Sequence, residues 1–398
     1  MTRRPPTDDR FDFDAINPIR IACGPGLAET VVEELEALGY EPLDRQRAGV
    51  DLKGTFADAM RLNLHLRTAL HVLYELKAFR CHDADTLYDE VRSVAWEDLI
   101  EPDGYLCVTS HVDHPSINNS MFPNLRVKDA IVDRMNDRLG RRPDSGPERD
   151  RFVVGLSWMG DRAWLSINTS GRKLSDRGYR KIPHVAPMKE TLAAAVIMAT
   201  GYTGEQPLVN PMCGSGTLAI EAALIGLGRA PGLLRSNFGL MHVKGYPEAL
   251  WREMRREAKN AGRKALGARI IASDIDPDAI DAARRNATTA GVDHLIDFHV
   301  CDFALTPLPD EPGLVIFNPA YGERLDDLSG LEATYRRIGD FFKQRCAGST
   351  GFVFTGNLDL GKRVGLKPSR RIPFFNAHIE CRLYRYELYD GSRRTTPE

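Results

Sequence analysis

The sequence predicts a small α+β part in its first half and an open α/β domain with a mostly parallel sheet in its second half. Three observations predict the α/β domain. A glycine-bearing turn joins a short apolar run to an Ala- and Leu-rich helix within residues 206–228. Strand and helix patterns alternate from residue 189 onward, which is typical of βαβ units. A polar residue follows successive strands, at the sheet edge where α/β domains bind ligands.

Length and composition agree with two or three globular domains. The chain has 398 residues, of which 42% are hydrophobic. It has no apolar run of about 18 residues, the length that a bilayer-spanning helix needs. The opening stretch, MTRRPPTDDRFDFDA, lacks the apolar core of a signal peptide. We therefore expect a cytoplasmic protein that is not bound to a membrane.

The cysteines and histidines do not predict a metal site. The seven cysteines are scattered, odd in number and form no CxxC pair, which suits a reducing compartment. His111 and His114 are two potential ligands three residues apart, but no further His or Cys supports them. Structural histidines explain the pair more simply, so no metal is expected.

Local charge indicates a polyanionic partner that the net charge of −2 does not reveal. Residues 134–181 hold 12 Lys or Arg against 6 Asp or Glu, and residues 360–394 hold 9 against 3. Either stretch alone would usually be a solvated surface. Two such stretches in a nearly neutral chain favour a basic surface that faces nucleic acid.

The first half carries the patterns of a small α+β unit. After a polar lead-in, the apolar spacing predicts strands at 20–23, 50–52 and 105–111, helices at 26–38, 55–73 and 127–139, an amphipathic segment at 87–99, and a hairpin of 152–159 with 163–168. The segment at 55–73 has the length of one helix or of a helix pair. Nothing in this half is typical of a catalytic site.

The second half alternates helices and strands. The patterns predict helices at 189–200, 217–225, 248–266, 277–290 and 333–346, strands at 207–209, 268–273, 296–301, 314–317 and 350–355, and irregular chain at 231–246. Asp276 can cap the helix that starts at Pro277, and this helix ends before Gly291. The alternating run at 377–389 suits an antiparallel strand at an edge of the sheet.

The glycine loop at 211–216 suits a ligand without phosphate groups. Gly214 and Gly216 permit a sharp turn, and the helix start offers free N–H groups. A nucleoside triphosphate would want a lysine after the last glycine, where Thr217 stands. A dinucleotide would want GxGxxG with an acid about 20 residues further on, and no strand-ending acid lies there. S-adenosylmethionine (SAM) needs neither, and a loop without any ligand is the alternative.

The polar residues at the strand ends fit SAM when they are taken together. Asp274 is placed to accept both hydroxyls of a ribose, and Asp302 to accept the adenine amine. Each acid alone would more often cap a helix or lie on the surface. As a series after successive strands, they predict a SAM site without a metal. The expected cofactor-binding residues are Asn210, Pro211, Met212, Cys213, Gly214, Gly216, Thr217, Asp274, Ile275, Asp302, Phe303 and Asn318.

The next strand end, Asn318-Pro319-Ala320-Tyr321, suits methylation of an exocyclic amine on a base. The lone pair of such an amine is delocalised into the ring, so the reaction needs acceptors for the two N–H protons. The Asn318 side-chain oxygen and the Pro319 carbonyl can serve, and Tyr321 can stack on the extruded base. We expect Asn318, Pro319 and Tyr321 to be the catalytic residues. The alternative is an Asn-Pro turn beside a core tyrosine.

Long strings of this sequence resemble one known family. NPAYGERL at 318–325 and NPMCGSGTL at 210–218 are close to the NPPYGERL and DPMCGSGTL motifs of class I, SAM-dependent RNA guanine-N2 methyltransferases that carry a THUMP domain. The strings CGPGLAE at 23–29, LRVKDAIVD at 125–133, NTSGRKLSDRGYR at 168–180 and APMKETLAAA at 186–195 also match. The likeness covers most of the chain and is nearest to the guanine-N2 methyltransferase of bacterial 23S ribosomal RNA.

The resemblance implies the fold and the domains. It implies a Rossmann-like class I methyltransferase domain with a seven-stranded sheet and an antiparallel edge strand, preceded by an α+β ferredoxin-like piece and a THUMP domain that grip RNA. The expected boundaries are a flexible lead-in at 1–16, the RNA-binding part at 17–170, a linker at 171–186, the methyltransferase domain at 187–390 and a tail at 391–398. Some relatives carry a second methyltransferase domain, and the form with a single such domain is expected here.

RNA is the expected partner, and residues of two matched strings are expected to bind it. These residues are Arg126, Lys128, Arg172, Lys173, Arg177, Tyr179 and Arg180. The implied reaction converts SAM to S-adenosylhomocysteine and methylates guanosine at N2, in 23S rRNA or, as the close rival, in tRNA. No obligate protein partner is indicated.

Two departures from the family pattern bear on activity. Asn210 stands where an Asp is usual, and Ala320 where a second Pro is usual. Asn210 keeps an acceptor and Ala320 keeps the Pro319 carbonyl, so we expect retained methylation at a normal or reduced rate. An RNA-binding assembly factor with a degenerate SAM fold is the alternative from another class. DNA adenine-N6 and protein glutamine methyltransferases also use NPPY-like loops, but a THUMP-like half favours RNA.

Overall fold

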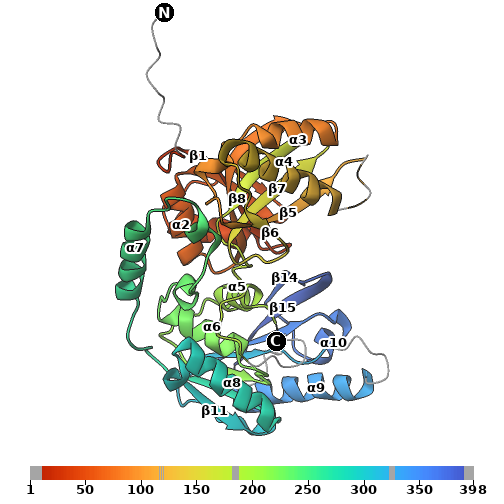
Figure 1. The fold of residues 1–398 in the computed structure, drawn as a ribbon. Helices are drawn as coiled ribbons and strands as arrows, with labels where there is room; N and C mark the ends of the chain where they lie inside the picture. The colour runs from red at the N-terminus through yellow and green to blue at the C-terminus, as the bar shows by residue number, and fades with distance from the viewer. Residues whose placement is uncertain are drawn as a thin grey trace, which may run out of the picture. The chain divides into compact units, whose positions relative to one another are not determined.

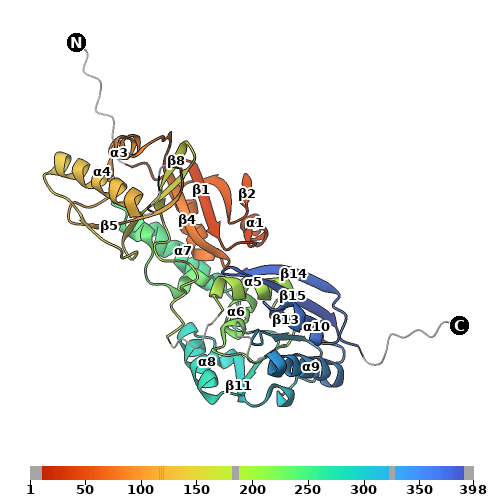
Figure 2. The same cartoon turned by 90° about the vertical axis from the view of Figure 1, so that its right-hand side faces the viewer.

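The computed structural model describes residues 11–115, 117, 119, 121–181, 188–321 and 328–389. The chain divides into two compact units, whose elements are labelled in Figures 1 and 2. Unit 1 comprises the chain up to Cys23, Val31–Leu174 and Arg235–Glu257, and unit 2 comprises Gly24–Thr30, Ser175–Leu234 and the chain from Ala258. Among the described residues, we find no helix with both the length and the apolar character that a membrane span requires.

Unit 1 is built on one eight-stranded sheet. Its strands are β1 (Asn17–Cys23), β2 (Asp44–Gln46), β3 (Gly49–Gly54), β4 (Ala69–Arg80), β5 (Tyr105–Asp113), β6 (Asp144–Ser145), β7 (Phe152–Met159) and β8 (Arg162–Asn168), in the order β2-β3-β1-β4-β8-β7-β5-β6. The long strand β4 pairs antiparallel with β1 on one side and β8 on the other, so early and late strands share one sheet. The predicted β7–β8 hairpin is confirmed, with Gly160 at φ 56° in its turn.

The helices of unit 1 differ from the predicted ones at one place, in residues 66–73. They are most of α1 (Ala28–Ala37), α2 (Phe56–His65), α3 (Ala84–Arg92), α4 (Met121–Leu139) and most of α7 (Glu248–Ala261). α2 starts in a capping box formed by Thr55 and Asp58. The predicted helix or helix pair at 55–73 is wrong beyond His65, because the chain turns extended at Leu66 and enters β4. Pairing with strands on both sides outweighs the helix-like spacing of the apolar residues there.

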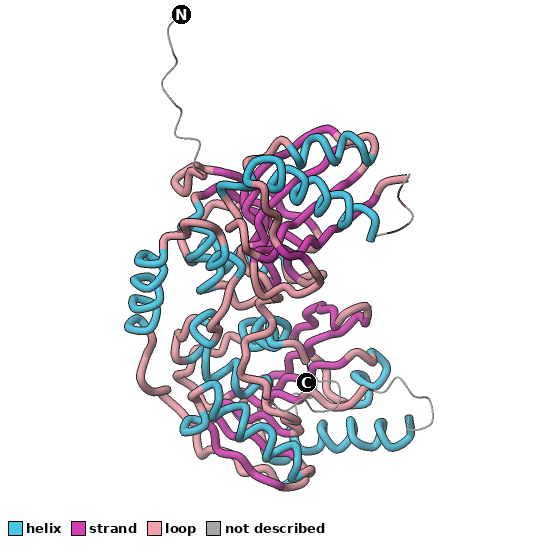
Figure 3. The backbone as a smooth tube through the Cα atoms, viewed as in Figure 1, coloured by secondary structure: helices cyan, strands magenta, loops and turns pink. Residues whose placement is uncertain are grey.

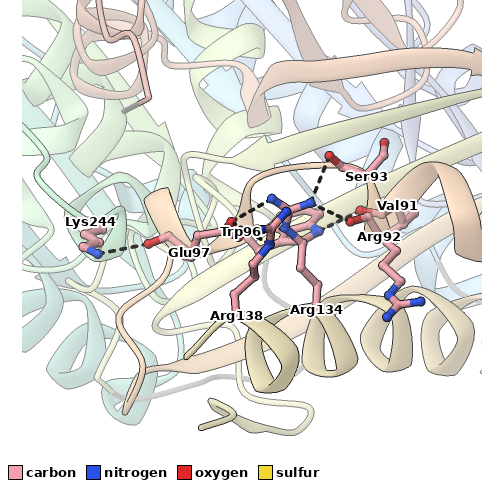
Figure 4. A network of polar contacts seen from close by, with 8 residues as sticks. All are labelled: Val91, Arg92, Ser93, Trp96, Glu97, Arg134, Arg138 and Lys244. Carbon is pink, nitrogen blue, oxygen red and sulfur yellow. Dashed lines mark hydrogen bonds and ion pairs between the residues drawn. The ribbon is translucent and has the colours of Figure 1, made fainter. Parts of the chain in front are cut away.

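A bidentate ion pair joins α4 to the short segment that follows α3 within unit 1 (Figure 4). Glu97 is mostly buried and accepts from Nε and Nη2 of Arg134, both at 2.7 Å. Arg134 also donates through Nη1 to the carbonyl oxygens of Arg92 and Ser93, and Lys244 donates to the Glu97 carbonyl oxygen at 3.0 Å. The hydrogen bond from Arg134 lowers the pKa of Glu97, so this carboxylate stays ionised and paired at neutral pH.

Unit 2 is a doubly wound α/β domain in which helix and strand alternate (Figure 3). Its strands are β9 (Leu208–Pro211), β10 (Ile270–Asp274), β11 (Ile296–Val300), β12 (Leu314–Phe317), β13 (Thr350–Thr355), β14 (Arg370–Asn376) and β15 (Ile379–Glu387). Its helices are α5 (Glu190–Thr200), α6 (Thr217–Gly226), α8 (Pro277–Ala290), α9 (Leu328–Arg345) and α10 (Leu358–Arg363). The sheet order is β11-β10-β9-β12-β13-β15-β14, which confirms the seven-stranded class I sheet. The predicted caps of α8, Asp276 and Gly291, are also confirmed.

The antiparallel strand β15 does not lie at the sheet edge as expected. It pairs antiparallel with β13 on one side and with β14 on the other, so β14 is the outer strand. The sequence of β14, RRIPFFN, is not predicted as a strand because it opens with two arginines and contains Pro373. A proline cannot donate to a neighbouring strand, and an edge strand is the position that tolerates it.

Different helices cover the two faces of this sheet. One hydrophobic cluster joins sheet residues to α9 and α10, and its sheet members include Val209, Ile271, Val315, Phe317 and Val353. Neighbouring residues in a strand point to opposite faces, so Leu208 and Ile270 turn to the other face, where α6 and α8 contact β10. With both faces covered, the carboxyl ends of β9, β10, β11 and β12 are left to form the ligand-binding edge.

Candidate active site

The glycine loop runs from the end of β9 to the start of α6. Met212 and Gly214 have φ angles of 55° and 54°, and Gly216, at φ 81°, precedes the first residue of α6. The Cys213 N–H donates to the Ser273 carbonyl oxygen at 2.9 Å, which ties the loop to the end of β10. Burial raises the pKa of the Cys213 thiol, which therefore stays protonated. The tight winding brings the chain from the end of β9 directly into the buried first turn of α6.

The two glycines of this loop differ in how much room they have, which gives a testable contrast. A Cβ at Gly216 would lie 2.9 Å from the Ala283 Cβ on α8, whereas a Cβ at Gly214 would meet nothing within 4 Å. Gly214→Ala should cost only the left-handed strain of about 1–2 kcal/mol. Gly216→Ala should cost about 1–3 kcal/mol more, because it also forces α6 and α8 apart. Urea unfolding of the matched pair checks this, and equal midpoints would contradict it.

Both carboxylate oxygens of Asp274 are held by backbone N–H groups. Gly214 N donates to Oδ2 at 2.9 Å, and Asp276 N donates to Oδ1 at 3.1 Å. The structure thus brings together two of the predicted cofactor-binding residues, from loops 60 residues apart. The side chain of Ile275, beside this carboxylate, is 69% exposed. An oriented acid next to an exposed apolar side chain is the surface that a ribose and a base require.

Asp302 and Phe303, just after the end of β11, both make contacts within the protein that the sequence does not predict. Asp302 Oδ1 accepts from Ala304 N at 2.9 Å and from Arg337 Nη2 at 2.6 Å. The hydrogen bond from Arg337, on α9, lowers the pKa of Asp302. Phe303 is 6% exposed and packs edge-on against Phe317 in the core. The Phe303 side chain is therefore a core residue, and only its backbone is left to contact a ligand.

Two buried amide oxygens lie at the ends of the neighbouring strands β9 and β12. Asn210 is fully buried, and its Nδ2 donates to the Ile316 carbonyl oxygen at 2.9 Å. The Oδ1 atoms of Asn210 and Asn318 are buried and have no hydrogen-bond partner among the described residues. A buried acceptor without a donor calls for an explanation, and a donor from a bound ligand is one that suits the ends of parallel strands. This contact uses the Asn210 amide as a donor, a role that an ionised Asp at the same position could not fill.

Tyr321 is held from two sides. Asn376, at the end of β14, donates through Nδ2 to the Tyr321 hydroxyl oxygen at 2.9 Å. A Cβ at Gly356, after β13, would lie 2.8 Å from Tyr321 Cε2, so the ring packs directly on this glycine. Pro319 is buried, and Tyr335 donates to the Ala320 carbonyl oxygen at 3.5 Å. Asn376 and Gly356 are positions that sequence reasoning missed.

Gly356→Ala should therefore move Tyr321 without touching the glycine loop. The added methyl group would overlap the ring, and a displacement of about 1 Å at a reacting centre can cost about 10- to 100-fold in rate. We expect methylation to fall by that amount while cofactor affinity stays within twofold. Steady-state kinetics and calorimetry on the same preparation check this. A parallel loss of both quantities would show that the substitution disturbs the whole domain instead.

Three family models match this chain. Residues 177–385 match the RMKL-like methyltransferase domain, residues 19–73 the RlmL ferredoxin-like domain, and residues 81–168 the THUMP domain. This chain belongs to the RMKL-like methyltransferase family. The resemblance drawn from NPMCGSGTL and NPAYGERL is thereby confirmed, as is the order of a ferredoxin-like piece, a THUMP domain and a class I methyltransferase domain.

Relatives of this RMKL-like chain carry names from RNA methylation. A protein of Synechocystis sp. (strain PCC 6803), provisionally named an RNA methyltransferase, is 36% identical over 364 residues, which cover 92% of this chain and 95% of that protein. The ribosomal RNA large subunit methyltransferase K/L of Syntrophotalea carbinolica is 38% identical over 374 residues, which cover 91% of this chain and 52% of that protein. The chain thus spans about half the length of this K/L relative.

Solved structures share the whole fold. A protein provisionally named a methyltransferase, crystallised with SAH, gives a TM-score of 0.84 at 28% identity and covers 95% of this chain and 99% of that one. A predicted N6-adenine-specific DNA methylase from Listeria monocytogenes gives 0.83 at 32% identity, with coverages of 94% and 96%. TrmN from Thermus thermophilus gives 0.67 at 20% identity, with coverages of 94% and 100%, and shows the fold alone.

Four of the expected RNA-binding residues lie in unit 1 of this RMKL-like chain, and they differ from one another in exposure and in contacts. Arg172 and Lys173 have exposed side chains, and the side chain of Lys128 is 33% exposed. Arg126 donates through Nη2 to Asp85 at 2.6 Å and so helps to pack α4 on α3. Arg172 also lies 3.7 Å from Glu148, so the RNA-binding role of Arg172 and Lys173 stays a prediction.

Arg177 and Tyr179 do not lie on a surface. Each is 1% exposed, so the prediction that they bind RNA is wrong. Both side chains face Glu221 inside unit 2. Arg180 is also turned inward, with 16% of its side chain exposed. In the sequence, this segment has the composition of a basic linker. Its actual partner is Glu221, a buried acid on the apolar helix α6, and the sequence does not reveal that contact.

The described residues include no group of three or more His, Cys, Asp or Glu placed to hold a metal ion. A cavity of about 130 Å³ lies where β12 and β13 begin and is lined in part by Pro312, Gly313 and Ser349. That is the opposite edge of the parallel strands, so this cavity is separate from the strand ends described above.

Proposed function

We propose that this protein transfers a methyl group from SAM to the exocyclic N2 amine of a guanosine in structured RNA, with 23S rRNA as the first candidate. Residues 17–170 would bind RNA, residues 171–186 link the parts, and residues 187–390 carry the chemistry, in the cytoplasm. The observation that carries the proposal is the buried Oδ1 of Asn318, which has no hydrogen-bond partner among the described residues and lies at the strand end next to the glycine loop. SAM supplies the methyl group as an electrophile on a sulfonium sulfur.

The residues at the strand ends fit SAM by their donor and acceptor types. Asp274, oriented by two N–H groups, accepts from the ribose hydroxyls. Ile275 offers an exposed apolar contact beside the adenine, and Asn210 Oδ1 is a buried acceptor for the amino group. Gly214 and Gly216 allow the cofactor to approach the backbone. The SAH complex of a structural neighbour supports the same class of ligand.

Asn318, Pro319 and Tyr321 prepare the guanine. The Asn318 oxygen and the Pro319 carbonyl accept from the two N2 protons, which turns the lone pair out of conjugation and toward the methyl group. Tyr321, fixed by Asn376, provides a flat surface for the flipped base. The methyl carbon–sulfur bond breaks, a carbon–nitrogen bond forms, and N2 then releases a proton to water. Positioning and electrostatic complementarity provide the rate enhancement.

RNA is favoured over DNA by the THUMP match and by the relatives' names. The Listeria neighbour is named a predicted N6-adenine-specific DNA methylase. An NPPY-like loop suits the exocyclic amine of adenine as well as that of guanine. A THUMP domain and the name "ribosomal RNA large subunit methyltransferase" favour RNA. A tRNA guanosine is the close alternative. The departures at Asn210 and Ala320 keep open a second function, an RNA-binding ribosome-assembly factor with weak catalysis.

Incubation with methyl-labelled SAM and purified rRNA, tRNA or DNA, followed by nucleoside analysis, tests the proposal. We expect N2-methylguanosine in rRNA prepared from cells that lack the gene. If the product is N6-methyladenine, the enzyme methylates adenine, and the proposed guanine substrate is wrong. RNA binding without SAM binding would favour the assembly factor.

A further inference from the structure

Residues 175–180 lead into unit 2 just ahead of α5. Three of their long side chains point at α5 and α6, and α6 follows the glycine loop. These side chains belong to Arg177, Tyr179 and Arg180. They are buried or mostly buried, and each contacts α6 or the start of α5. None of the roles proposed above uses these contacts.

Arg177 and Tyr179 meet on one acid of α6. Glu221 is fully buried, and its Oε1 accepts from the Tyr179 hydroxyl at 3.1 Å and lies 3.6 Å from Arg177 Nε. Burial raises the pKa of Tyr179 well above its usual range, so the phenol remains a donor. Glu221 stands one turn after Thr217 on α6, so this pair fixes the first turns of the helix from one side.

Arg180 joins the first residues of two helices. Its Nη2 donates to the Thr217 hydroxyl at 3.1 Å and to the Met188 carbonyl oxygen at 2.7 Å. Its Nε lies 3.3 Å from the carboxylate of Glu190. Thr217 begins α6 directly after Gly216, and Glu190 begins α5. One guanidinium therefore ties the end of the glycine loop to the start of a second helix.

Helix stability alone does not account for this arrangement. A cation beside a helix N-terminus opposes the helix dipole, and Arg180 lies at the N-termini of both α5 and α6. Glu190 compensates the charge, and its own pKa is raised by burial, so the ionised pair has an energetic cost. The cost of the Arg180–Glu190 pair has an explanation if the pair fixes the position of Thr217 for ligand binding.

We infer that Arg180 is a positioning residue of the cofactor loop: by holding Thr217 it fixes the Gly214–Gly216 turn against which SAM binds. Arg177 and Tyr179 support the same helix through Glu221. The inference rests on the proposed function in that the ligand of the loop is SAM. It replaces an RNA-binding role for residues 177–180 with a role in cofactor affinity.

The test measures SAM binding to the full chain by calorimetry without RNA. Arg180→Gln should weaken SAM binding about tenfold, because one charge-assisted contact to the loop is lost. Arg180→Lys should recover part of the affinity, since an ammonium can reach one of the partners but not all three. Arg285→Gln is the matched control, as Arg285 is an exposed arginine of α8 in the same unit, paired only with Asp281 among the contacts described. Its affinity should equal that of the wild type.

The binding curve separates positioning from folding. A structural defect would lower the fraction of protein that binds and leave the dissociation constant unchanged, whereas lost positioning raises the constant at full stoichiometry. Tyr179→Phe, which removes only the hydroxyl, gives a second measurement if Arg180→Gln is unstable, and it should weaken binding about threefold. Wild-type affinity in a folded Arg180→Gln variant overturns this inference alone. Absence of SAM binding by the wild type overturns the proposed cofactor as well.

Discussion

Replacing Asn318 by alanine is expected to lower the rate of methyl transfer about 100- to 1000-fold, the usual effect of removing one preorganised polar group from a reacting centre. The buried Oδ1 atom has no partner among the described residues and is the acceptor that would turn the guanine lone pair. Alanine removes this acceptor, and the lone pair then stays conjugated with the ring. SAM affinity should fall far less, because Asp274 and the glycine loop are untouched.

Single-turnover methylation with saturating enzyme measures this rate without product release. The control is Asn260→Ala, which removes the same side chain from an exposed position on α7 and should leave the rate unchanged. A calorimetric titration with SAM shows whether the Asn318→Ala protein still binds cofactor. A rate within twofold of the wild type would remove Asn318 from the mechanism.

Asp274→Asn is expected to weaken SAM binding about 100-fold or more, although the two side chains have the same shape. Both oxygens of Asp274 accept from backbone N–H groups, from Gly214 at 2.9 Å and Asp276 at 3.1 Å. Either orientation of an asparagine amide would place its NH2 group against one of these donors. The ribose contact and the position of the loop are then lost together, and hydrogen bonds to a charged group are worth about 1.5–3 kcal/mol each.

Asp278→Asn is the matched control for this substitution. Asp278 lies four residues further along the chain, in the first turn of α8, is exposed, and should tolerate the amide with unchanged SAM affinity. Thermal unfolding without ligand shows how much of the effect comes from the loop itself. If Asp274→Asn binds SAM as the wild type does, the carboxylate does not hold the ribose.

Much of the fold could be predicted from the sequence because its signals are local. The limits of β12, β13 and α8 agree with the apolar spacing and the capping residues to within a residue. The failures lie where tertiary pairing outweighs local preference. β4 replaces a predicted helix because it pairs on both sides, and β14 is an edge strand that contains a proline.

The candidate site divides in the same way. Gly214, Asp274 and Asn318 could be selected because each lies at or just after the end of a strand, and parallel strands end at one edge. Their supports could not be selected, because nothing near Tyr321 in the sequence points to Asn376, and nothing near Asp302 points to Arg337. The sequence assigns Arg177, Tyr179 and Arg180 to RNA for the same reason, since charge in a sequence does not show whether a side chain is buried.

The sequence by itself determined the order of the domains, the alternation of strand and helix, and the series of polar strand ends, because motifs and periodicity are properties of neighbouring residues. Only the tertiary structure decided which face Arg177 and Tyr179 turn to, which N–H groups orient Asp274, and which strand lies at the sheet edge. Those outcomes depend on contacts between segments separated by 42 residues for Tyr179 with Glu221 and 60 for Gly214 with Asp274. Such contacts form only when helices and strands pack, so no short stretch of sequence encodes them.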